Sequence, residues 1–166
     1  MDKLAEAEVS FKKALEFQKM VNRSMNQGNA HRGLGHIYRR LNKLDEAEVS
    51  YHKALELYMA SNTLFNQGIV HQGLGETYLL MNKLNEAEAS FQKALEVKKA
   101  ANDVVGQGIA MNGLGRVYMK RSQLEEAKSM FEEALKLHKQ IKATSYEQHD
   151  QLCLDNVLNK MRSAWK

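Results

Sequence analysis

Apolar residues recur along this chain at spacings of three and four, which brings their side chains onto one face of an α-helix. One stripe predicts a first helix over about 67–81, and its members are Val70, Leu74, Tyr78 and Met81. A second stripe begins at Leu84 and predicts a second helix. Only Asn82-Lys83 separates the two stripes. Because such a connection is short, we expect the two helices to lie antiparallel.

The whole pattern repeats every 40 residues without insertion or deletion. The skeleton G-L-G-x-x-Y starts at Gly33, Gly73 and Gly113, and a further copy of the second stripe begins at Leu4. A fixed period of this length is typical of a stacked array of repeats, in which the core runs continuously between neighbours. We therefore expect an all-α superhelical solenoid of antiparallel helix pairs with about eight helices.

The paired glycines allow two interpretations. A phosphate-binding loop normally occurs once, between a strand and a helix, whereas these pairs occur three times with no β-rich run before them. A glycine inside a helix costs about 1 kcal/mol relative to alanine, so three copies indicate a packing role. We expect the missing Cβ atoms to let neighbouring helices approach closely, opposite small residues such as Ala47 and Ala54.

The repeats also predict the organisation of the chain as one array over residues 1–166. It should contain a lone second helix of a truncated repeat, three helix pairs and a C-terminal capping helix, over residues 1–26, 27–66, 67–106, 107–146 and 147–166. Second helices should end near Asn22, Asn62 and Asn102, because asparagine tolerates the left-handed conformation that closes a helix.

The two ends of the array differ from its middle. The first stripe lacks a preceding helix, so we expect a fragment of a longer protein with an N-terminal end that associates readily. In the last segment Leu154-Asp155 replaces Leu114-Gly115. Its apolar stripe, with Asp150 expected on the polar side, is typical of a terminal cap.

Composition excludes several classes of protein. The chain has no proline, 27% charged residues and no apolar run near the ~18 residues of a membrane span, so no membrane partner is expected. Its formal net charge of +4 is too small and too dispersed to predict nucleic-acid binding. Cys153 is the single cysteine, which excludes an intrachain disulfide and favours a reducing compartment, the cytoplasm.

Candidate catalytic chemistry is sparse. The six histidines are scattered over different repeat positions, and none is paired with a second ligand at metal-binding spacing. Cys153 lies on an apolar stripe, where a small buried side chain is expected rather than a nucleophile. The sequence therefore predicts a protein that is not an enzyme and that has no metal or cofactor.

The small and large positions of each repeat resemble the tetratricopeptide repeat family. In the middle copy they are Leu74, Gly75, Tyr78, Ala87, Phe91 and Ala94, and the other copies match in register. The 40-residue unit is similar to the longer repeats of Pins-type spindle-orientation adaptors and of kinesin light chains. The chain departs from the family by lacking its usual proline and by placing His31, His71 and Met111 at a usually aromatic position. The resemblance implies a right-handed superhelix.

The resemblance also implies a concave groove lined by the first helices. The groove residues would be Asn29, Arg32, His36, Arg39, Ile69, Gln72, Glu76, Leu79, Ile109, Asn112, Arg116 and Met119, with His149, Leu152, Asn156 and Asn159 of the cap at its end. Such a groove would be basic at its first end, apolar in the middle through exposed Ile69 and Leu79, and basic again near Arg116.

Two functions remain open at this point. The first is an adaptor module whose groove binds an extended or helical peptide of another protein, with acidic and apolar residues in the peptide. The alternative is a structural spacer or self-association segment that uses the open N-terminal end of the array. Uneven groove chemistry favours the first, and the incomplete first repeat favours the second.

Overall fold

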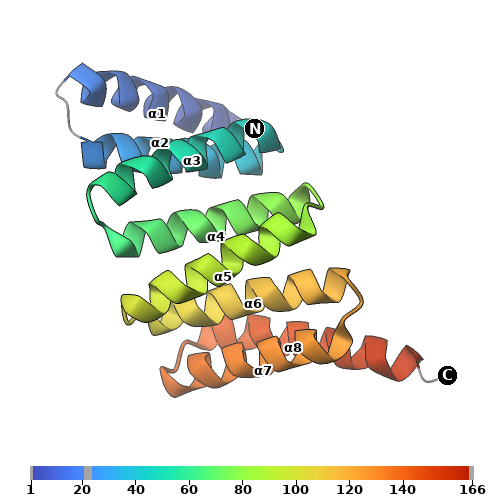
Figure 1. The fold of residues 1–166 in the computed structure, drawn as a ribbon. Helices are drawn as coiled ribbons and strands as arrows, with labels where there is room; N and C mark the ends of the chain where they lie inside the picture. Colours follow the sequence, from blue (N-terminus) through green and yellow to red (C-terminus); the bar gives the residue numbers. More distant parts are fainter. Residues whose placement is uncertain (1, 21–23, 165–166) are drawn as a thin grey trace.

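The computed structural model describes residues 2–20 and 24–164, and over these ranges the chain forms eight α-helices and no strand. Figure 1 shows them stacked in chain order along one axis. Their bounds are α1 (Asp2–Met20), α2 (Ser24–Arg40), α3 (Leu44–Ala60), α4 (Leu64–Leu80), α5 (Leu84–Ala100), α6 (Val104–Lys120), α7 (Leu124–Gln140) and α8 (Thr144–Ala164). The predicted all-α solenoid of antiparallel helix pairs is confirmed.

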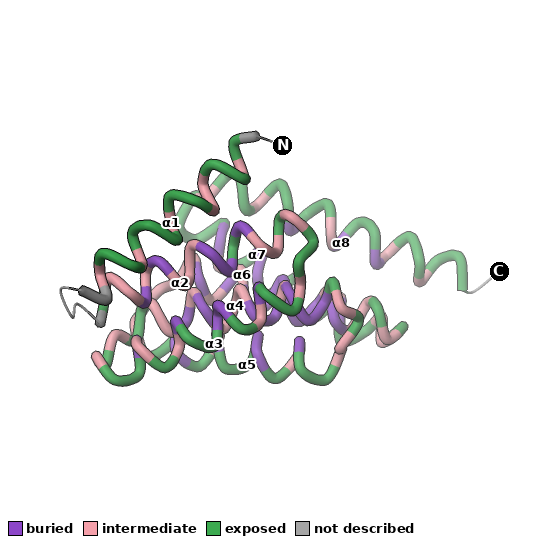
Figure 2. Tube along the Cα trace, turned by 90° about the horizontal axis from the view of Figure 1, so that it is seen from above, coloured by how far each residue is buried: buried purple, intermediate pink, exposed green. Residues whose placement is uncertain are grey.

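Each helix packs against its neighbours in the chain, and the first helices of the pairs also contact one another directly, α2 with α4, α4 with α6 and α6 with α8. The second helices make no such contact among themselves in the described ranges. The first helices therefore form the inner layer and the second helices the outer layer. Figure 2 shows the buried residues concentrated in α2 to α7, with α1 and the far half of α8 mostly exposed. No helix in the described part of the chain has an apolar stretch long enough to span a bilayer.

The turns owe their geometry to single residues in the left-handed conformation. Asn62 and Asn102 have φ of 50° and 53°, as predicted, whereas Asn22 lies outside the described residues. The turns from first to second helix have the same geometry, with φ of 58° at Asn82. There the amide of Lys83 donates to the carbonyl of Tyr78 over 2.9 Å, which satisfies a carbonyl that the helix end would otherwise leave unpaired.

The first helix of the middle pair begins at Leu64 rather than at Gln67. Its first turn includes Leu64 and Phe65, which are 43% and 56% exposed. Because these side chains do not join the buried stripe, the hydrophobic pattern gave no sign of this turn. Phe65 instead lies under the Lys98 ammonium, 4.4 Å from its ring centroid, a geometry that stabilises the cation.

The glycines serve helix packing, as predicted. All ten lie in α2, α4 and α6, and none has a positive φ. The residues opposite them, however, are not the small alanines that we expected: Gly68 and Gly106 face the Lys98 side chain, and the other eight face aromatic rings. A Cβ on Gly75 would lie 2.8 Å from the ring of Phe91, and one on Gly73 would lie 2.6 Å from that of Tyr51. Glycine is required because a ring occupies the volume of its side chain.

Each central ring is inserted between two glycines of successive first helices. Tyr51 on α3 contacts Gly35 of its own pair and Gly73 of the next pair. Phe91 on α5 contacts Gly75 and Gly113 in the same way. One aromatic side chain therefore joins three helices at once, and this contact carries the stack from one repeat to the next.

A polar ladder accompanies the rings along the outer edge of the stack. The Tyr78 hydroxyl donates to Glu48 over 2.9 Å, and Lys83 forms an ion pair with the same carboxylate at 3.3 Å. One repeat later, Tyr118 and Arg121 share Glu88 in the same manner. Each ladder unit connects a second helix to the following pair, so it sets the spacing of the repeats.

Helix α8 is held by a buried polar network instead of a glycine pair. The His138 Nδ1 atom lies 2.5 Å from Asp150 Oδ2, and both side chains are almost completely buried. The other ring nitrogen faces the carbonyl of Val105 at 3.2 Å. The expectation that Asp150 faces solvent is wrong, because the residue is 1% exposed.

The remaining Asp150 oxygen accepts from the Asn112 amide over 2.9 Å. Tyr146 stacks on the His138 ring with a centroid distance of 4.9 Å. The network therefore contains one side chain from each of α6 and α7 and two from α8, and it fixes the rotation of α8 on the stack.

Candidate functional site: the concave groove

The inner layer of first helices bears three hollows in a row, which together form the concave groove. The first measures about 490 Å³ and lies between α2 and α4. The second, of about 420 Å³, lies between α6 and α8, and the third, of about 350 Å³, continues along the same two helices. Glu76 lines both the first and the second, and Arg116 lines both the second and the third. The hollows are therefore continuous.

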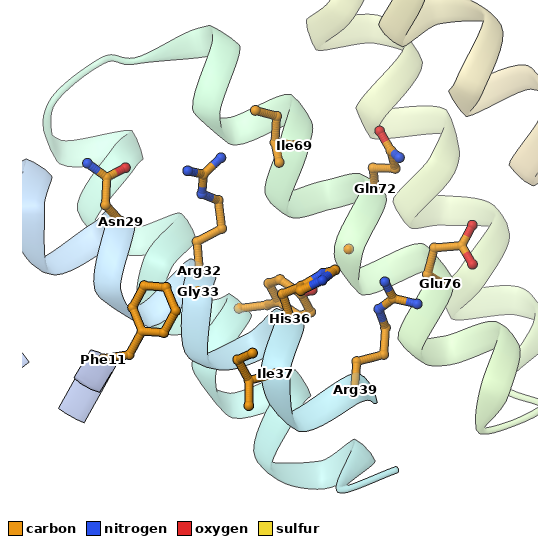
Figure 3. Close-up of a pocket in the computed structure, with 12 residues that line it drawn as sticks. Phe11, Asn29, Arg32, Gly33, His36, Ile37, Arg39, Ile69, Gln72 and Glu76 are labelled. Atoms are coloured by element: carbon orange, nitrogen blue, oxygen red, sulfur yellow. The ribbon is translucent and has the colours of Figure 1, made fainter. Parts of the chain in front are cut away.

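The first hollow combines cationic walls with an aromatic and aliphatic floor. Figure 3 shows Asn29, Arg32, His36 and Arg39 projecting from α2 and Ile69, Gln72 and Glu76 from α4. Phe11 and Tyr51, the rings that pack on the glycines, also line it. The same 40-residue periodicity that stacks the repeats thus places one residue of each first helix at each level of the groove.

The two arginines of the first hollow have no carboxylate partner among the described residues. Arg39 lies beside the Tyr51 phenol; burial raises the pKa of Tyr51, and the guanidinium partly offsets that effect. The Nε atom of Arg39 is buried without a hydrogen-bond acceptor, a condition that costs free energy unless a ligand supplies one. Burial, followed by the nearby charges of Arg39 and Arg40, lowers the pKa of His36, so this ring is neutral at pH 7.

The C-terminal part of the groove is less basic than expected. Arg116 forms an ion pair with Glu76 at 2.5 Å between Nη1 and Oε1, which neutralises both side chains at the junction of the first two hollows. Asn112 is 5% exposed because its amide is held by Asp150. Lys120 and Lys160 therefore carry the positive charge at this end, in the third hollow, and Arg32 and Arg39 carry it in the first hollow.

Leu79 does not line the groove. It is 2% exposed and belongs to the core that joins α3, α4 and α5, so the expected exposed apolar centre at this residue is wrong. The equivalent Arg39 and Met119 do line hollows. This repeat position lies at the border of the buried face, where a long side chain extends outwards and a short leucine is covered.

Most of the other predicted groove residues line one of the three hollows, but Leu152 does not. Ile69 and Ile109 line the first and second hollows, and Met119 lines the third. On α8, His149 and Asn156 face the groove, whereas Leu152 is 68% exposed and lies over the outer surface against Leu135. Groove residues that the sequence did not indicate are Phe11, Tyr51, Tyr146, Cys153 and Lys160. Phe11 and Tyr51 lie at repeat positions that the sequence assigns to the apolar stripe of the second helices, although both rings also line the groove.

The described residues of the groove are suited to binding a ligand rather than to holding a metal ion or activating a nucleophile. Among residues 2–20 and 24–164 no group of three histidine, cysteine, aspartate or glutamate side chains is placed to hold a metal ion. Cys153 lies 3.8 Å from the His149 ring, but burial raises the pKa of its thiol, which disfavours the thiolate needed for nucleophilic attack. The hollows are lined by charged, amide, aromatic and aliphatic side chains.

One histidine outside the groove provides a test of the packing by pH. Burial, followed by Lys93 and His52, lowers the pKa of His71 from its ordinary 6.5 to about 4. Between these values the unfolded chain binds a proton that the folded chain does not, so the free energy of unfolding should fall as the pH falls from 6.5 to 4. His71→Gln should flatten this part of the profile in urea titrations, and exposed His149→Gln should not. Parallel profiles for the parent and His71→Gln would contradict the assignment.

Comparisons with known proteins agree with this architecture. The tetratricopeptide repeat family matches residues 26–100 and 61–140. Among solved structures, BtubC (BKLC) from P. vanneervenii superposes with a TM-score of 0.76 at 19% identity, over 98% of this chain and 74% of that one. The apo form of RapI gives a TM-score of 0.88 at 15% identity, over 96% of this chain and 58% of RapI. No curated protein matches the sequence.

At these identities the two structures establish similarity of fold alone. The family match stands on the sequence itself and spans most of α2 to α7. It covers the repeated glycines, the aromatic rings between them and the first hollow's α2 and α4 walls. The chain therefore belongs to the tetratricopeptide repeat family.

Proposed function

We propose that this chain is a non-catalytic interaction module that binds a peptide segment of a partner protein in the concave groove. Its membership of the tetratricopeptide repeat family supports protein interaction in general. The observation that carries the groove assignment is the first hollow. There Arg32 and Arg39 have no carboxylate partner, and the Arg39 Nε atom has no acceptor, within the part of the chain that the structure describes.

The chemistry of this hollow selects for acidic residues. A guanidinium has five N–H donors and no acceptor, and it pairs with carboxylates in a fork geometry. The two arginines project from α2 about two turns apart. Across the hollow, Ile69 of α4 lies toward Arg32 and Glu76 lies toward Arg39. A peptide with carboxylates spaced along one side and an aliphatic residue on the other would satisfy both walls. Such a peptide would also supply the acceptor that the buried Nε atom lacks.

Affinity and selectivity should arise from different residues. Exposed charge pairs contribute only about 0–1 kcal/mol each, whereas hydrogen bonds to a buried charged group contribute about 1.5–3 kcal/mol. Arg39, which is half-buried, should therefore matter more than the exposed Arg40 beside it. Charge attraction across the groove should also accelerate association, with a rate that falls as salt is added.

The test begins with a displayed library of random 12-residue peptides selected on the purified chain. Enriched peptides should contain Asp or Glu spaced with Leu or Ile. Titration of one such peptide should show a loss of affinity of about tenfold or more for Arg39→Ala, and a comparable loss for Ile69→Asp. Arg40→Ala is the matched control, since Arg40 neighbours Arg39 but does not line the hollow.

Two outcomes would contradict the groove assignment. Peptides enriched without acidic residues would exclude the arginines as the recognition element. Unchanged binding to Arg39→Ala, together with loss of binding for Lys53→Glu, would move the site to the opposite surface, where Lys53 lines a separate hollow. Leu79→Asp is unsuitable as a test because Leu79 is in the core.

A second function, interaction through the N-terminal end of the array, is favoured by one observation. Within the described ranges helix α1 packs against α2 alone, whereas α3, α5 and α7 each pack between two first helices. Its outward face includes Phe17, which is 60% exposed. Contiguous exposed apolar residues mark interaction sites in many proteins.

A further inference from the structure

Helix α1 leaves exposed or half-buried a stripe of side chains whose equivalents are mostly buried in the other second helices. Ala14 is exposed, whereas the equivalent Ala54, Ala94 and Ala134 are all 0% exposed. The stripe is uncharged and follows helical spacing, and we define it as the open face of α1: Ala7, Ser10, Phe11, Ala14 and Phe17. The rest of the fold therefore contains three examples of what covers such a face.

In each example the cover is a helix with two glycines seven residues apart. Gly28 and Gly35 of α2 contact Tyr58 and Tyr51 of α3, which are also seven residues apart on an antiparallel helix. The glycine pairs 68/75 of α4 and 108/115 of α6 contact α5 and α7 in the same way. Phe11 contacts Gly33 of α2 on one side only. Its other side lacks the second glycine that Tyr51 and Phe91 possess.

No helix in the described ranges has such a glycine pair free for a second copy of the chain. Those of α2, α4 and α6 are covered by their own partners. In α8 the equivalent positions hold Gln148 and Asp155. Asp155 stands where α6 has Gly115, and a Cβ at Gly115 would lie 2.6 Å from the Phe131 ring. Stacking of α8 onto α1 of another copy would produce the same clash with Phe11.

We infer that the open face of α1 binds an α-helix that carries two glycines seven residues apart and that lies outside residues 2–20 and 24–164. The first helix of another tetratricopeptide-type repeat has this chemistry. One glycine would accept the free side of the Phe11 ring, and the other would pack near residue 18, in continuity with the three internal interfaces. This surface meets the groove only at the Phe11 ring, which lines the first hollow, and its partner would extend the array rather than enter the groove.

The probe is a fluorescent peptide with the sequence of residues 61–83, which contains α4 with Gly68 and Gly75. It should bind the purified chain, as followed by fluorescence anisotropy. Ala14→Arg should weaken binding at least tenfold, since the arginine occupies the contact. Ala5→Arg is the matched control, because Ala5 and its equivalents Asp45, Asn85 and Glu125 are all exposed. Thermal melts of both variants should match the parent, since neither residue is buried.

A second peptide with Gly68→Leu and Gly75→Leu should fail to bind. Leucine has a higher helix propensity than glycine, so loss of binding would not reflect loss of the peptide's helix. Equal binding of the two peptides, no binding of either, or full binding by Ala14→Arg would overturn the inference. Binding that Arg39→Ala abolishes would place the peptide in the groove instead. Concentration-dependent dimerisation of the chain that Ala14→Arg abolishes would identify a second copy as the occupant and would also overturn it.

Discussion

Asp150→Ala should lower the free energy of unfolding by about 3–5 kcal/mol. The substitution leaves the His138 ring buried without its carboxylate partner and removes the acceptor of the Asn112 amide. Both groups would then be desolvated and unsatisfied, which costs far more than the net stabilisation by an intact pair. Urea unfolding followed by circular dichroism measures the difference.

Asp155→Ala is the matched control on the same helix. Asp155 is exposed and bonds only Gln151 in the described part of the chain, so its loss should change stability by about 0.5 kcal/mol or less. Amide exchange should further show that Asp150→Ala accelerates exchange first in α8, because each element of a repeat array depends mainly on its neighbours. A change below about 1 kcal/mol for Asp150→Ala would mean that the network does not hold the cap.

Phe91→Ala should also cost about 3–5 kcal/mol, the usual range for removing a buried ring. Phe91 is 0% exposed and is inserted between Gly75 and Gly113. Because both glycines lack a Cβ, nothing near the ring can move into the cavity without shifting a helix. The loss should therefore fall in the upper part of the range, as measured by urea unfolding.

The repeat supplies a matched control at Phe11. This ring is half-buried and contacts one glycine instead of two, so Phe11→Ala should cost clearly less than Phe91→Ala. Gly75→Leu alone should destabilise by about 1–3 kcal/mol through overpacking against the Phe91 ring. In the double variant the leucine enters the volume that the ring has left. The double variant should therefore lose less stability than the sum of the two single losses. Additive losses, or equal losses at residues 11 and 91, would contradict the insertion of the ring.

Much of the fold was predictable because helical spacing, turn residues and the 40-residue period are local properties. The stripe from Val70 to Met81 lies on α4, and asparagine ends α3 and α5 in the left-handed conformation. The predicted start of α4 lies three residues after the observed one, because the apolar side chains of its first turn are exposed. The glycines were recognised as packing residues, but their true neighbours were not, because contact between Gly73 and Tyr51 depends on how two repeats stack.

The candidate site was less predictable than the fold. Periodicity assigns a residue to a side of a helix, but Arg39, Leu79 and Met119 share one position and differ in exposure because their lengths differ. Charge counts along the groove could not show that Arg116 pairs with Glu76, 40 residues earlier in the chain. Only when two first helices lie side by side do these two charges meet.

The sequence by itself determined the array: helix lengths, turn positions and the register of the repeats follow from short-range spacing, which each segment encodes alone. Only the tertiary structure decided which polar side chains are paired with an opposite charge and which are left without such a partner. Stacking neutralised Glu76 with Arg116 and buried Asp150 against His138, and it left Arg32 and Arg39 without a carboxylate partner among the residues that the structure describes. The physical reason is that the energy of a charge depends on its distance from other charges and from water. Those distances are set by helices that are far apart in the chain.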